Sequence, residues 1–114
     1  MRVCIPSPYP GGPDTPITKP FEQADMLDYY ELSSAGSFEQ IAQTRNCIGA
    51  CIDPVEAIMR RGVEIVIVAG ISDSYLMRFK TAGVRVFMAS SSDARQLLQD
   101  AIHNRLAEAK RETK

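Results

Sequence analysis

Two cysteines near the middle of the chain have a residue type and spacing that could hold a soft metal. Cys47 and Cys51 lie four positions apart, just before a helix that Asp53 is predicted to cap. Thiolates placed there could bind one metal ion or one edge of an iron–sulfur cluster, and the positive end of the helix would lower their pKa. The chain has three cysteines and no second close pair, so it cannot supply four thiolate ligands. Buried structural cysteines remain the alternative interpretation.

Small residues gather in the loops that the predicted parallel strands lead into. The candidate cofactor-binding residues are Gly11, Gly12, Gly49, Gly70, Ile71 and Ser72. Small residues let a backbone approach a ligand, and unpaired amides at helix N-termini favour anions. Short loops also need glycine and serine to turn and to cap helices, so a structural role stays open. The glycine-rich motifs that bind nucleotide phosphates are absent from the sequence.

No catalytic centre is predicted. A cysteine nucleophile needs a base, and the only histidine, His103, falls in the last predicted helix, away from these loops. Asp53, Asp73 and Asp93 stand where helix N-caps are expected, which is the commoner use of such residues. A cysteine-dependent enzyme is therefore a lesser alternative.

The elements that must position these residues alternate regularly after residue 53. The first half of the sequence predicts a strand over 2–5 that stops at Pro6, a proline-rich loop to Pro20 and a hairpin over 27–32 and 38–44. The second half predicts a helix from Pro54 to Gly62, a strand over 63–69, a helix from 73 to Gly83 and a strand over 84–88. A last helix follows, with an apolar stripe formed by Leu97, Leu98, Ala101, Ile102 and Leu106. The arm over 38–44 would also suit a helical turn.

This order predicts an α/β fold. Alternating strands and helices give parallel strands with right-handed crossovers, and the hairpin adds one antiparallel strand. The strand over 63–69 has almost no polar residue, which indicates helices on both faces of the sheet. We therefore expect three layers, α/β/α, with a mixed sheet of about five strands. Ligands of such sheets bind beyond the carboxyl ends of the strands.

Length and charge narrow the class of protein. With 114 residues, 45% of them hydrophobic, the chain predicts a single domain over 1–109, followed by a charged, frayed tail over 110–114. A net charge of −1 argues against nucleic acid as a partner. The longest apolar run, 65–71, is too short to span a membrane, no signal peptide is recognisable, and three cysteines suit a reducing compartment. We therefore expect a cytoplasmic protein.

Four segments in register carry a family resemblance: residues 1–7, 48–51, 62–71 and 82–87. Together they resemble the dinitrogenase iron–molybdenum cofactor biosynthesis family, and the likeness extends to about residue 106. The resemblance implies a ribonuclease H-like α/β/α motif with one antiparallel strand. It also implies a small protein or accessory domain that carries nitrogenase cofactor or its iron–sulfur precursor.

The chain departs from the family pattern at two places. Where family members have His-Phe-Gly-Arg-Ala, whose histidine is a candidate cluster ligand, this sequence has Pro20–Ala24 with proline in place of the histidine. Where they have Gly-Gly-Ile-Gly, this sequence has Ala69–Ser72. Cys51 falls where members often have a cysteine or a small residue, whereas Cys47 is additional.

The thiol pair and the resemblance together predict a non-catalytic binding or carrier module for an iron–sulfur or related metal cluster. Cys51 and Cys47 would be the ligands, and the glycine loops would line the pocket. The expected partners are proteins that donate or accept the cluster, with neither nucleic acid nor membrane; a homodimer stays open. The alternative is an apo module on the same fold that binds small anions or proteins and has lost the cluster, as Pro20 in place of histidine suggests.

Overall fold

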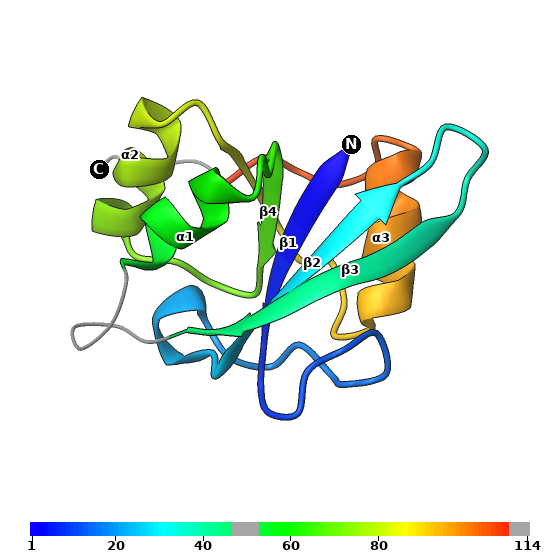
Figure 1. Cartoon of the computed structure of the whole chain (residues 1–114), viewed down its shortest axis with the longest axis horizontal. Coiled ribbons are helices and arrows are strands. Elements are labelled where there is room, and N and C mark those ends of the chain that lie inside the picture. The colour runs from blue at the N-terminus through cyan, green and yellow to red at the C-terminus, as the bar shows by residue number, and fades with distance from the viewer. Residues whose placement is uncertain (47–52, 110–114) are drawn as a thin grey trace.

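The computed structural model contains a five-stranded sheet in the order β3-β2-β1-β4-β5 (Figure 1). The structure describes residues 1–46 and 53–109. The strands are β1 (Arg2–Ser7), β2 (Met26–Leu32), β3 (Phe38–Arg45), β4 (Ile65–Val68) and β5 (Arg85–Met88). β2 is antiparallel to β1 and β3, whereas β1, β4 and β5 are parallel. One strand therefore runs against the other four, as the sequence predicts, and the 38–44 segment is a strand.

Helices cover both faces of this sheet, so the three-layer prediction is confirmed. Helices α1 (Pro54–Arg60) and α2 (Asp73–Thr81) pack on one face, and α3 (Ala94–Ile102) packs on the other (Figure 1). A single turn of 3-10 helix, η1 (Phe21–Gln23), adds Phe21 to the core under α1 and α2. Within residues 1–46 and 53–109 no helix is long and apolar enough to cross a membrane.

Local sequence signals set most of the element boundaries. All four residues of β4 are buried, because helices cover both of its faces. The side chains of Asp53, Ser72 and Asp93 accept hydrogen bonds from backbone N–H groups in the first turns of α1, α2 and α3. Gly62 follows the end of α1 with φ of 67°, a conformation that glycine adopts without strain.

The first strand runs two residues further than predicted. Pro6 and Ser7 pair with β2, although the sequence suggests that the strand stops at Pro6. Pairing of β1 with β4 has already ended at Cys4. In an antiparallel ladder alternate N–H groups point away from the partner, so a proline at such a position removes no ladder bond.

The last helix is shorter than its apolar stripe predicts. It ends at Ile102, and Asn104 then takes a left-handed conformation with φ of 56° that turns the chain back toward the sheet. Leu106 packs against the α3 side of the core from outside the helix. The returning chain donates from Ala109 N–H to Val86 O at 2.8 Å and covers the outer edge of β5.

Candidate functional site

The loops that leave the parallel strands gather at one edge of the sheet, which we call the loop edge. β1, β4 and β5 lead there into residues 8–20, 69–72 and 89–93. β3 runs parallel to β1 and also ends there, and α1 and α2 begin there (Figure 1). Open α/β sheets bind their ligands at this edge.

The predicted metal ligands Cys47 and Cys51, and also Gly49, lie outside the described residues. The residue before them in the chain, Asn46, is fixed at the loop edge. Its N–H donates to Asp25 O at 2.9 Å, and its Nδ2 donates to the Phe21 carbonyl oxygen at 2.7 Å.

Residues 47–52, which we call the thiol segment, are followed in the chain by Asp53, which is fixed at the same edge. Its Oδ2 accepts a hydrogen bond from Glu56 N–H at 3.3 Å and forms an ion pair with the Arg78 guanidinium. The two residues that flank the thiol segment in the chain therefore both have defined partners at the loop edge.

A cavity of about 360 Å³ opens beside Asn46. Its lining residues are Tyr9, Asp25, Met26, Arg45 and Asn46. The Asn46 Oδ1 atom is buried and has no hydrogen-bond partner among the described residues. The lining carries one carboxylate, Asp25, and one guanidinium, Arg45, and the Asp25 carboxylate lies 3.9 Å from Lys19 Nζ.

Gly11 and Gly12 are held by the sheet through a buried carboxylate. Gly12 N–H donates to Asp28 Oδ2 at 2.8 Å, and Gly11 N–H donates to Pro8 O at 2.8 Å. A Cβ atom at Gly11 would lie 2.8 Å from Asp28 Oδ1, so only glycine fits this approach. The amides of both glycines, predicted to face a ligand, thus already have partners within the chain.

The Gly70–Ser72 segment is covered by η1. Gly70 O accepts from Phe21 N–H at 2.8 Å, and Ser72 N–H donates to both carboxylate oxygens of Glu22, at 3.1 and 3.2 Å. Ile71 packs against the core on the α1 and α2 side. The two predicted glycine segments therefore lie toward opposite faces of the sheet, with Gly11 and Gly12 on the α3 side.

The most elaborate polar cluster of the described residues surrounds Asp28, which sequence reasoning missed. Asp28 is fully buried in β2. Its Oδ2 accepts from Ser7 Oγ at 2.7 Å and from Gly12 N–H, and its Oδ1 accepts from the Nε2 atoms of Gln43 at 2.6 Å and Gln40 at 3.2 Å. The sequence does place an aspartate inside a run of strand-favouring aromatic and aliphatic residues. A carboxylate buried in such a strand must be paired with hydrogen-bond donors, and this requirement was the signal for the cluster.

A β-bulge lets two glutamines of one strand reach the same carboxylate. Residues three apart in a regular strand point to opposite faces of the sheet. The register of β2 with β3 shifts between Tyr29 and Tyr30, and Ile41 is the extra residue. Gln40 and Gln43 consequently both face Asp28, so the bulge serves the loop edge.

The third cysteine is not available as a metal ligand. Cys4 lies inside β1, is fully buried and is part of the hydrophobic core. Burial, followed by the nearby negative charge of Asp28, raises the pKa of its thiol well above the usual value. Residues 1–46 and 53–109 contain no group of three His, Cys, Asp or Glu side chains arranged to hold a metal ion.

Other acids near the loop edge and the histidine have structural roles. Asp53 and Asp93 cap helices, as predicted, whereas α2 is capped by Ser72 and Asp73 is its first residue. The exposed Asp14 pairs with Arg95 at 2.9 Å, and this guanidinium lowers the pKa of the Asp14 carboxyl. His103 follows the end of α3, at the opposite edge of the sheet from the loop edge, and its Nδ1 lies 2.8 Å from Gln99 O.

Several solved structures share this fold. The protein PH0822 superposes with a TM-score of 0.78 at 19% sequence identity, covering 96% of this chain and 96% of that chain. The apo form of the orange protein from Desulfovibrio gigas gives a TM-score of 0.74 at 17% identity, covering 99% of this chain and 96% of that one. The Thermotoga protein TM1290 gives 0.73 at 22% identity, covering 99% and 97%. At these identities the likeness establishes the fold alone.

The sequence itself establishes the family. A search of curated proteins finds no match. The family model described as "Dinitrogenase iron-molybdenum cofactor" matches residues 1–104, which is nearly the whole chain. The chain therefore belongs to the dinitrogenase iron–molybdenum cofactor family, as the four segments in register predict.

Proposed function

We propose that this protein is a non-catalytic carrier that holds an iron–sulfur cluster, or a precursor of one, at the loop edge. Membership of the dinitrogenase iron–molybdenum cofactor family over residues 1–104 is the observation that carries the proposal. The fold supports it, because Asn46 and Asp53, which flank residues 47–52 in the chain, lie at the edge where α/β sheets bind ligands. The partners are proteins that donate or accept the cluster, in a reducing cytoplasm that keeps the thiols free.

Cys47 and Cys51 are the proposed thiolate ligands. Of the three cysteines, Cys4 is excluded by its burial and by its raised pKa. The described residues offer no alternative set of metal-binding side chains, so the proposal depends on the two thiols in 47–52. Two thiolates would hold one edge of a cluster and leave the opposite edge for a partner protein, which suits a transient carrier.

The residues around the thiol segment suit an anionic cargo. Thiolate-bound iron–sulfur clusters carry negative charge, and the Arg45 guanidinium lines the cavity beside Asn46. In this proposal Gly11, Gly12 and Gly70–Ser72 contribute shape rather than amide donors, because the N–H groups of Gly11, Gly12 and Ser72 are already bonded. Pro20 supplies no imidazole where the family pattern has one, so the thiols carry the binding.

Anaerobic reconstitution with iron and sulfide tests this function. We expect the wild-type protein to retain iron and sulfide after desalting. The double variant Cys47→Ser/Cys51→Ser should retain at least about tenfold less iron and sulfide. Cys4→Ala is the matched control, since it removes a thiol that takes no part, and it should load like the wild type. Loading of the double variant at the wild-type level would remove the two ligands from the proposal, and a wild-type protein that retains no iron would remove the carrier function.

A further inference from the structure

The sheet has one covered edge and one open edge. At β5, Met88 N–H donates to Ala107 O at 2.9 Å and Ala109 N–H donates to Val86 O, so the returning chain covers that side. β3 is the last strand at the other side, and within residues 1–46 and 53–109 no strand pairs with its outer edge. An open edge strand can accept an extended peptide as an additional strand.

A groove of about 660 Å³ runs beside this open edge, between β3 and α1. Its lining residues are Arg2, Glu31, Ile41, Ala42, Thr44, Ala57, Arg60 and Arg61. Three arginines against one glutamate give it a surplus of positive charge, although the whole chain has a net charge of −1. The one glutamate, Glu31, is paired with the amino group of Met1 at 3.0 Å and with Arg2 Nε at 3.4 Å.

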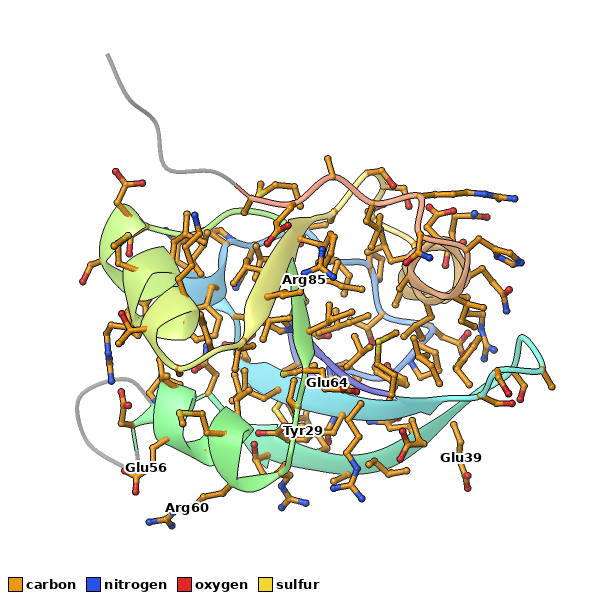
Figure 2. All side chains as sticks on the ribbon, turned by 90° about the horizontal axis from the view of Figure 1, so that it is seen from above. Tyr29, Glu39, Glu56, Arg60, Glu64 and Arg85 are labelled. Atoms are coloured by element: carbon orange, nitrogen blue, oxygen red, sulfur yellow. The ribbon has the colours of Figure 1, made fainter. Side chains whose placement is uncertain are left out.

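The arginines of this groove are positioned by neutral groups as well as by acids. The Arg61 guanidinium lies 5.0 Å from the centre of the Tyr29 ring, so its contact there is an aromatic face rather than a carboxylate. Arg2 Nη1 donates to the Arg61 carbonyl oxygen at 2.7 Å. Arg60 is exposed on α1 and forms an ion pair with Glu56 at 2.7 Å, a contact between solvent-exposed side chains that an incoming carboxylate can share or replace (Figure 2). The Arg61 guanidinium, which faces the Tyr29 ring, keeps N–H groups for an incoming carboxylate.

We propose that this groove docks an extended acidic segment of a partner protein, which pairs with the outer side of β3 and places carboxylates against Arg60 and Arg61. The bulge at Ile41 interrupts the edge and leaves residues 42–45, next to the groove, as the pairing segment. Glu39 lies on the other side of the bulge, opposite Glu31, and repels acidic side chains there (Figure 2). Arg60 and Arg61 are not among the residues proposed to hold the cargo, although the pairing segment ends at Arg45, which lines the cavity beside Asn46.

Charge argues against a second copy of this chain as the occupant. Two copies paired antiparallel through β3 would form one continuous sheet around a two-fold axis perpendicular to it. Both arginine grooves would then lie on the same face of that sheet, each with its positive surplus. An acidic partner has no such repulsion.

Titration of the ¹⁵N-labelled apo protein with defined peptides tests the proposal by NMR. The probe is the acetylated and amidated peptide Val-Glu-Val-Glu-Val-Glu, compared with its Val-Gln version and with a form N-methylated at alternate residues. We expect the acidic peptide to shift the amides of residues 42–45, Arg60 and Arg61, and to bind about tenfold more tightly than either control peptide. N-methylation removes the donors that strand pairing needs.

Variants of the protein complete the test. Arg61→Glu and, separately, Arg60→Glu should each weaken binding of the acidic peptide by about tenfold. Arg85→Glu, an exposed arginine on β5 away from the groove (Figure 2), should leave the affinity unchanged. Equal binding of the Val-Gln or the N-methylated peptide, or no change in Arg61→Glu, would overturn the proposal. Citrate that produces the same shifts and displaces the peptide would instead assign the groove to small polyanions.

Discussion

Asp28 shows how a single residue ties the core of this protein to its loop edge. A carboxylate at zero exposure is costly unless it is fully hydrogen bonded, and here two glutamines, one serine and one backbone amide supply the donors. Its position could be recognised as unusual from the sequence, since aspartate is rare inside strands. Its hydrogen-bond donors could not be predicted, because Gly12, Gln40 and Gln43 are distant from it in sequence and meet it only when the sheet forms.

Replacing Asp28 should destabilise the protein strongly. Asp28→Ala removes the common acceptor of four hydrogen bonds and leaves the Gly12 N–H without a partner, and we expect the free energy of unfolding to fall by about 3 kcal/mol. Asp28→Asn keeps one acceptor oxygen in the same place and should cost less, about 1–2 kcal/mol. Urea denaturation of both variants measures the two differences. Equal stability of Asp28→Ala and the wild type would contradict the role given to this network.

Cys4 should be chemically inert in the folded protein. Burial holds its thiol in the protonated form, and the thiolate is the reactive species. Exposure to iodoacetamide near pH 8, followed by mass spectrometry, should leave Cys4 unmodified until guanidinium chloride is added. Alkylation of Cys4 at similar rates with and without denaturant would show that the thiol is accessible, and would return it to the set of candidate ligands.

At the scale of elements, the sequence correctly predicts the features that depend on residues close together in the chain. The fully apolar β4, the caps of α1 and α3 and the hairpin follow from sequence signals. Features that depend on distant contacts were missed. The bulge at Ile41 serves Asp28, and the early end of α3 allows the chain to return along β5, so neither is visible in local propensity.

The two buried tyrosines of β2 make the stability of the protein depend on alkaline pH. Burial, and then the nearby Cys4, raises the pKa of Tyr29 to about 12, and burial also raises the pKa of Tyr30. Because these pKa values are higher in the folded than in the unfolded chain, the neutral phenols stabilise the fold fully below pH 10 and lose that contribution as the pH rises through 12. Tyrosine absorbance followed during a pH titration should show two phenols that ionise only with unfolding. Ionisation of all four tyrosines near pH 10 in a folded protein would contradict this.

At the scale of the molecule, the architecture follows from the sequence more fully than the site does. Alternating strands and helices after residue 53, together with one hairpin, determine the three layers and the single antiparallel strand. The same order predicts the loop edge. It does not predict that Glu22 and Asp28 would occupy the amides of Ser72 and Gly12, because these contacts are made between segments far apart in the chain.

Differential alkylation of the loaded protein tests whether Cys47 and Cys51 together hold a metal cluster. Apo and reconstituted protein are exposed to iodoacetamide under anaerobic conditions, and each cysteine is quantified by mass spectrometry. We expect both thiols to be alkylated in the apo protein and protected in the loaded protein, with Cys4 unmodified in both. Equal alkylation of Cys47 and Cys51 in protein that retains its iron and sulfide would contradict it.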